Sequence, residues 1–235
     1  GSGEEDGSIV VRGTGTQRFT GQMILSGGDI VVGRGATVVL SGSASLSSET
    51  KGGVTLAGGS FILDNLSGTN NQNRLRGAAA DFDSTGVETI GGGAFTLIGG
   101  TTGTKEYVAR LQLGSVNNSN TVSTARAGAL NINIVHNAAA AETSLTFAAY
   151  TRSGVNPNAS NRQYATVNFT AQDGTGTTLA LGQTGVANPK VFFGNSFTVP
   201  LSVAGAHGLL NATGGATDAG WATVNGTDFA SYGVN

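Results

Sequence analysis

Three short segments near the middle of the chain indicate the fold: Leu130-Asn131-Ile132-Asn133-Ile134-Val135, Leu145-Thr146-Phe147-Ala148-Ala149-Tyr150 and Ala165-Thr166-Val167-Asn168-Phe169-Thr170. Each is about one strand long, largely alternates apolar with polar or small residues, and is rich in β-branched or aromatic side chains. Loops of small residues separate them, without a capped helix between them. The pattern predicts β-strands on neighbouring coils, with an inward-pointing core that includes Leu145, Phe147, Val167 and Phe169.

Length and composition are those of a folded all-β protein. The chain has 235 residues, enough for one large β domain with a real core. Only 11% of the residues are charged and 39 are glycine, but 38% are hydrophobic and many of these fall in regular β-branched clusters. Disordered segments lack such clusters. We therefore expect residues 1–235 to form a single module, preceded by a flexible acidic lead-in at 1–7.

Charge and cysteine content exclude several classes of function. The formal net charge is -2, and the twelve Lys and Arg residues are scattered singly, so no basic patch predicts a nucleic-acid partner. Cysteine is absent, which excludes disulfides and thiolate metal sites. No apolar run approaches the ~20 residues that span a bilayer, so we expect no membrane insertion.

The same short-strand pattern continues along most of the chain. The longest clean alternation, 107–113, is expected to place Tyr107, Ala109, Leu111 and Leu113 on one face. The Gly58-Gly59 pair between two strands is either a hairpin turn or a corner between sheets. Further strands are expected at 8–12, 22–26, 29–32, 36–41, 54–57, 60–64, 95–98, 178–181, 190–193, 197–199 and 221–224.

Two all-β architectures suit strands of four to six residues at this spacing. One is a parallel β-helix, a solenoid in which each coil adds a strand to two or three sheets, and the alternative is a β-sandwich. Hairpin dipeptides such as Asn-Gly are missing at most junctions, and small polar corners recur instead. These features favour the β-helix, with almost no helical content.

Several motifs, taken in order, resemble autotransporter-associated β-strand repeats of very large bacterial surface proteins. They are 15–21, Gly58-Gly59-Ser60-Phe61-Ile62-Leu63-Asp64-Asn65, Asn73-Arg74-Leu75, Gly92-Gly93-Ala94-Phe95-Thr96-Leu97, 143–169 and 221–232. The resemblance implies a right-handed parallel β-helix that is secreted and displayed at the cell surface. It carries over no catalytic residues.

The residues that could perform chemistry form no recognisable site. His136 and His207 are the only histidines, and seventy residues separate them, so neither a zinc site nor a catalytic triad is indicated. Asp81 and Asp83 would share one face of an extended segment, but Ca²⁺ requires six to eight oxygen ligands. A solvated turn is the better interpretation of that pair.

The densest acidic stretch, which adds Asp64 and Glu88 to Asp81 and Asp83, lies near Arg74 and Arg76 in a loop-rich region. It lacks the clustered carboxylates on one sheet that polysaccharide-cleaving β-helices present. We expect no catalytic residue, no cofactor, no metal site and no enzymatic activity.

Two functions remain. The first is a non-catalytic structural module, extracellular and at the cell surface, whose coils stack into a stiff rod or fibre with its own copies or with neighbouring modules of a longer chain. Its open ends would then associate head to tail. The alternative is an adhesin that binds a glycan or a host or neighbour-cell protein through loops 70–76 and 156–162. The residues expected to mediate self-association are Ile9, Val10, Val11, Phe229 and Tyr232.

Overall fold

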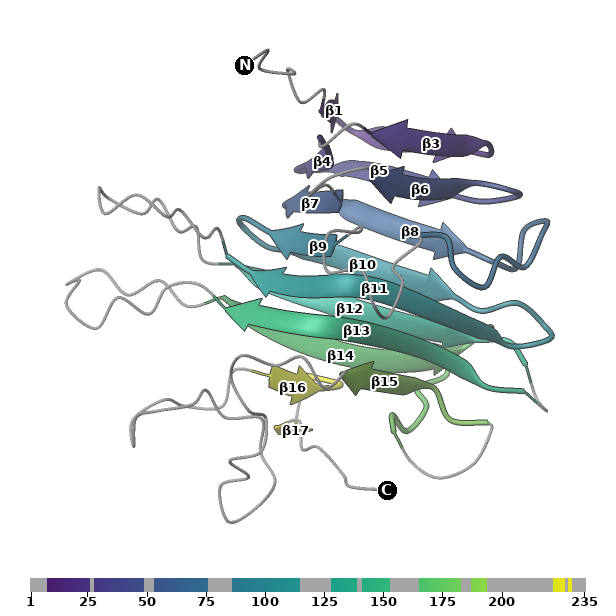
Figure 1. Ribbon diagram of the computed structural model, residues 1–235. Helices are drawn as coiled ribbons and strands as arrows, with labels where there is room; N and C mark the ends of the chain where they lie inside the picture. The colour runs from purple at the N-terminus through teal and green to yellow at the C-terminus, as the bar shows by residue number, and fades with distance from the viewer. Residues whose placement is uncertain are drawn as a thin grey trace.

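The computed structural model of the chain is all-β (Figure 1). It describes residues 8–25, 28–48, 53–75, 86–114, 128–138, 141–152, 165–182, 187–193, 222–226 and 228–229. Within these ranges the regular secondary structure consists of strands and contains no helix. The expectations for the lead-in at 1–7 and for Arg76, Asp81, Asp83, His207, Tyr232, 156–162 and 197–199 fall outside them.

Three sheets contain all of the strands that the described residues form. Sheet A has seven, in the order β1 (Ile9–Val11), β4 (Asp29–Gly33), β7 (Gly53–Ala57), β9 (Gly86–Thr89), β11 (Thr104–Leu113), β13 (Thr143–Arg152) and β15 (Lys190–Phe193). Sheet B has eight, in the order β17 (Asp228–Phe229), β16 (Ala222–Val224), β14 (Thr166–Asp173), β12 (Ala129–His136), β10 (Gly93–Ile98), β8 (Ser60–Asp64), β5 (Ala36–Leu40) and β2 (Gly15–Phe19). Sheet C pairs β3 (Gln22–Leu25) with β6 (Ser45–Ser48).

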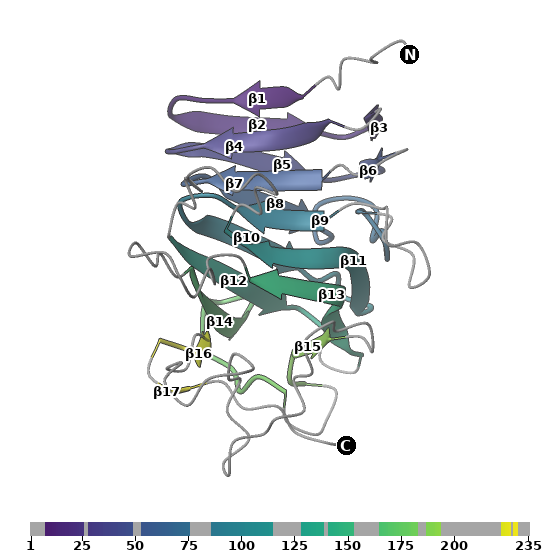
Figure 2. The ribbon, with the colours of Figure 1, turned by 60° about the vertical axis from the view of Figure 1, so that its left-hand side comes forward.

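The chain winds through these sheets as a parallel β-helix. Strands that follow each other in the sequence mostly lie in different sheets, and each pairs in parallel with the strand one coil later, as Ile9 does with Ile30. The coils therefore stack along one axis (Figure 2). Connections between parallel strands of one sheet are right-handed in about 98% of cases, so we expect a right-handed solenoid. Among the named strands only β16 and β17 pair antiparallel, so the structure is not the antiparallel sandwich considered as the alternative.

The cross-section changes along the axis. The first two coils have a separate third side, made by β3 and β6, whereas β11 and β13 are ten residues long and cover both the third side and sheet A. In β11 Val108 and Leu111 are both buried, three positions apart, because the strand bends at Ala109, where its Cα pairing with β13 is interrupted. The expectation that Tyr107 shares a face with Leu111 is therefore wrong. Tyr107 is 39% exposed.

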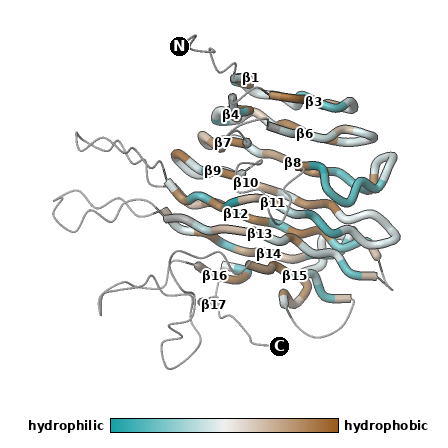
Figure 3. The backbone as a smooth tube through the Cα atoms, in the orientation of Figure 1, coloured by the Kyte–Doolittle hydropathy of each residue, from teal (hydrophilic) through white to brown (hydrophobic). Residues whose placement is uncertain are grey.

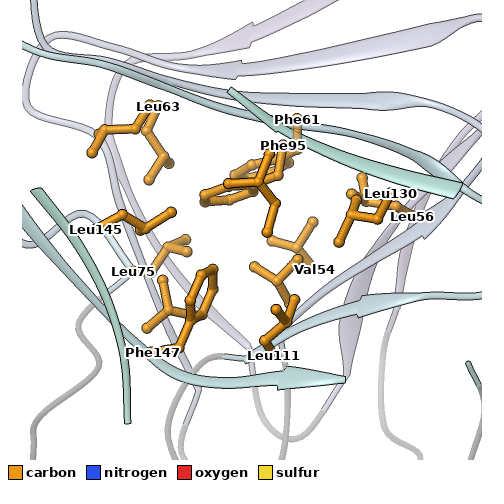
Figure 4. Packing of buried hydrophobic residues seen from close by; sticks show 14 of the residues in the cluster. Val54, Leu56, Phe61, Leu63, Leu75, Phe95, Leu111, Leu130, Leu145 and Phe147 are labelled. Carbon is orange, nitrogen blue, oxygen red and sulfur yellow. The ribbon is translucent and has the colours of Figure 1, made fainter. Parts of the chain in front are cut away.

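A single apolar core runs the length of the stack. Parallel in-register pairing places like residues above one another, so Phe61 stacks on Phe95 with ring centroids 6.2 Å apart. Phe147 likewise stacks on Phe193 at 5.8 Å. Figure 4 shows side chains of the different sheets meeting in this core, and Figure 3 shows hydrophobic and hydrophilic positions interspersed along the strands. The four expected core residues are buried, which confirms that prediction: Leu145, Phe147, Val167 and Phe169.

Glycine makes the corner between sheets A and B. Gly58 and Gly59 join β7 to β8, which decides for a corner and against a hairpin. Gly58 has a φ of +88°, where a side chain would be strained, and a Cβ on Gly59 would lie 2.5 Å from the Gly33 carbonyl oxygen. Glycine at both positions allows successive coils to approach closely at this corner.

Most of the expected strands that fall in the described residues are present, with differences at a few places. Strands β2, β6 and β9 form from sequences with few apolar residues. The strand expected at 178–181 does not form. Thr178 makes only an isolated antiparallel bridge to Gln172, because the Asp173 side chain accepts hydrogen bonds from the backbone N–H groups of Thr175 and Thr177 and turns the chain back.

Replacing Phe147 with Asp should unfold the module. The side chain is fully buried between coils, so the change removes an aromatic ring worth about 3–5 kcal/mol and buries an unpaired charge as well. Thr146→Asp is the matched control, since Thr146 directly precedes Phe147 in β13 and is only partly buried. Thermal unfolding followed by far-ultraviolet circular dichroism should show a folded control and an unfolded Phe147→Asp variant. A variant that melts like the parent would exclude Phe147 from the core.

Candidate functional site at the ends and polar corner of the solenoid

The first coil presents an open edge on all three sides of the solenoid. Within the described residues β1, β2 and β3 each pair with only one neighbouring strand, so their other edges are unpaired. Ile9 and Val11 point inward and are partly buried against the core, while Val10 is 49% exposed on the outer side of sheet A. The three residues expected to mediate self-association at this end thus lie together on one edge strand.

The other end of sheet B is built differently. Strand β17, which contains Phe229, folds back antiparallel on β16, with Phe229 opposite Thr223. The turn between them holds Asn225 and Gly226 at φ values of 52° and 72°, the left-handed region that Asn-Gly tolerates best. The backbone of Phe229 is thus paired on one side within the chain, and β17 is the outermost strand of the sheet.

The other residues singled out from the sequence are dispersed. Asp64 is buried and forms an ion pair with Arg18 at 3.2 Å. Burial opposes ionisation of Asp64, but hydrogen bonds from Ser67, Arg18 and Leu66 lower its pKa below the usual value. His136 is buried, with Nδ1 3.0 Å from the Thr143 hydroxyl, and burial lowers the pKa of its imidazole. Both side chains make contacts within the chain.

Glu88 lies on the outer side of sheet A. It pairs in register with Thr55 and Gln112, and Thr55 donates a hydrogen bond to Asp29 at 2.8 Å. Burial and the charge of Asp29 raise the pKa of Glu88, while Arg110 and Gln112 act against that rise. Glu88 is therefore separated from Asp64 and Arg74, which belong to the same acidic and basic stretch of the sequence but lie at another side of the coil.

Arg74 anchors a polar corner, which we define as Asp64, Asn65, Asn70, Arg74 and Glu106. The side chain is fully buried and donates five hydrogen bonds. Their acceptors come from three segments of the chain: Asn65 Oδ1 and the carbonyl oxygens of Gly42, Ala44, Asp64 and Thr69, at 2.7–3.0 Å. One guanidinium thus joins the loop after β8 to the preceding coil. Burial lowers the pKa of Arg74, against the charges of Glu106 and Asp64.

Amide side chains of the loop after β8 extend the polar corner to the next coil. Asn70 donates hydrogen bonds to the Thr102 hydroxyl and the Gly103 carbonyl, and it accepts one from the Thr104 hydroxyl. Gln72 donates to the same Gly103 carbonyl. This loop is hydrophilic along much of its length (Figure 3). Its polar groups, expected to form an adhesive surface, are largely engaged in contacts within the chain.

Glu106, on β11, completes the polar corner. Its carboxylate accepts hydrogen bonds from the backbone N–H groups of Arg74 and Leu75 at 2.9 and 2.8 Å. The residue is fully buried, and burial raises its pKa to about 8, against the two hydrogen bonds and the charge of Arg74. The alternation at 107–113 does not predict this contact, because the bend at Ala109 shifts the inward positions of β11.

The described residues also limit other kinds of site. They hold no group of three or more His, Cys, Asp or Glu side chains placed to bind a metal ion. No helix among them is long and apolar enough to cross a membrane.

The chain matches no protein-family model, no curated protein and no solved structure.

The buried carboxyl of Glu106 should make stability fall as the pH rises. Its folded pKa of about 8 lies above the ordinary 4.5, so the folded state holds this proton more tightly than the unfolded chain. Its contribution is fully present below about pH 4.5 and is lost as the pH rises through about 8. The melting temperature of the parent should be lower at pH 8.5 than at pH 5. The difference between the two pH values should be smaller for Glu106→Gln.

Glu142→Gln is the matched control. Its hydrogen bond from Lys190 lowers the pKa of Glu142, so this carboxylate is ionised in both states over that range. The control should keep the parental dependence on pH. An equal fall of the melting temperature in the parent and in Glu106→Gln would assign the effect to other groups.

Proposed function

We propose that this chain is a non-catalytic structural module of an extracellular bacterial surface or fibre, and that its coils form a segment of a stiff rod. The observation that carries the proposal is the continuous core, to which every coil contributes stacked side chains. Interior strands pair on both sides, so unpaired backbone is confined to the ends of each sheet. A body of this kind resists bending and offers few sites to proteases.

The dimensions favour a unit that works in a series. Seven strands of sheet A at about 4.8 Å spacing give a stack only about 30 Å tall. A rod of useful length therefore needs more coils above or below, supplied by further copies of this chain or by neighbouring modules of a longer one. Both sources would place a strand against the open edges of β1, β2 and β3.

Contact between unlike ends is heterologous, and such a contact gives a filament when it does not close into a ring. The strands of the first coil pair in parallel with the next coil, whereas β17 pairs antiparallel with β16, so the two ends of the solenoid differ. Two copies would therefore associate head to tail. The extracellular location rests on the absence of cysteine, the low charge and the resemblance to surface-protein repeats.

Assembly through the first coil should depend on Val10. Val10→Lys places a charge on an edge strand, a common device against edge pairing, and should prevent polymer formation. Leu66→Lys is the matched control, because Leu66 is equally exposed, at 49%, but lies away from the first coil. Sedimentation velocity and negative-stain imaging at increasing concentration should show axial polymers of the parent and the control only. A parent protein that stays monomeric would contradict self-assembly of this chain and leave only the proposal that it is a rod segment.

A further inference from the structure

An exposed aromatic column crosses the outer side of the later coils. Tyr107, Thr146 and Phe192 are paired in register on β11, β13 and β15. Their neighbours Val108, Phe147 and Phe193 pack in the core, so the column faces outward. Tyr107 is 39% exposed and Phe192 is partly exposed.

A second column runs beside the first, two residues earlier on each strand, in which Lys105 is exposed, Lys190 is partly exposed and Ser144 between them is buried. Lys105, Ser144 and Lys190 are paired in register there. Glu142 forms an ion pair with Lys190 at 2.7 Å, and the charge of Lys105 also acts on this carboxylate. Two cations face one carboxylate, so the column is locally positive although the chain has a net charge of -2.

The two columns form a regular grid. Neighbouring strands lie about 4.8 Å apart, and alternate residues on one strand lie about 6.6 Å apart. The two aromatic rings are thus separated by about 10 Å along the solenoid axis, and the two lysines by the same interval. A surface that repeats in this way is complementary to a ligand that repeats, and its mixed character requires apolar faces and negative charges on that ligand.

We propose that Lys105, Tyr107, Thr146, Lys190 and Phe192 bind an extended polysaccharide that carries carboxylate groups. The apolar faces of alternate sugar rings pack on Tyr107 and Phe192, as aromatic side chains pack on flat apolar surfaces with their polar edge in water. Sugar carboxylates pair with Lys105 and with Lys190, which also pairs with Glu142, and the Thr146 hydroxyl accepts hydrogen bonds from sugar hydroxyls or donates to them. The site lies on the side of the rod, so it is independent of contacts at the ends.

Affinity electrophoresis and calorimetry with polygalacturonate as the probe, and uncharged dextran as its neutral counterpart, test the proposal. Tyr107→Ala and Lys105→Ala should each weaken polygalacturonate binding about tenfold without changing the melting temperature, because both side chains are exposed. Ile24→Ala and Arg34→Ala are the matched controls. They remove an exposed apolar side chain and an exposed cation elsewhere on the solenoid, and should bind like the parent.

Polygalacturonate binding by the parent and both controls that is weakened about tenfold in Tyr107→Ala and in Lys105→Ala supports the site. Absence of binding by the parent overturns the proposal. Equal loss in the control variants overturns it too, since attraction would then be unspecific. Equal binding of dextran, insensitive to Lys105→Ala, overturns the assignment to carboxylated glycans.

Discussion

Parallel pairing in register between successive coils is the constraint on which the structure depends. It places each residue directly above its counterpart one coil later, so the inward positions of one coil must fit those of the next in size and polarity. Phe61 on Phe95 satisfies this condition with two rings at an interplanar angle of 3°. The same condition explains why the core is one continuous cluster and why a charge at an inward position would affect two neighbouring coils.

The polar corner shows how a charge is accommodated under that constraint. Arg74 and Glu106 bring two ionisable groups to inward positions, and neither meets the other's charge directly in a hydrogen bond. Each instead binds backbone groups that the corner would leave unsatisfied: carbonyl oxygens in the case of Arg74, and two N–H groups in the case of Glu106. On the third side of the coil, between β6 and β11, the hydrogen bonds of the Arg74 and Glu106 side chains thus take the place of hydrogen bonds between strands.

The sequence predicts the fold wherever local apolar periodicity and stacking agree. The β12, β13 and β14 segments carry enough β-branched and aromatic residues to be recognised alone. Strand β6, with the sequence Ser-Leu-Ser-Ser, forms because it pairs with β3 on one side and donates the Leu46 N–H group to the Arg74 carbonyl on the other. The bend at Ala109 also cannot be predicted from local apolar periodicity, because it arises where β11 covers two sides of the coil. The inward place of Glu106, and hence the polar corner, could not be derived without it.

The antiparallel hairpin at one end gives the solenoid a direction. Asn225-Gly226 is a hairpin dipeptide of the kind that is rare at the other junctions, and the antiparallel strand pair forms there. A parallel stack can add coils at an edge whose strands run in the common direction, as at β1 and β2. At β17 the direction is reversed, so sheet B offers a new coil an antiparallel partner. Growth at the two ends is therefore chemically different, and a series of such modules has a defined polarity.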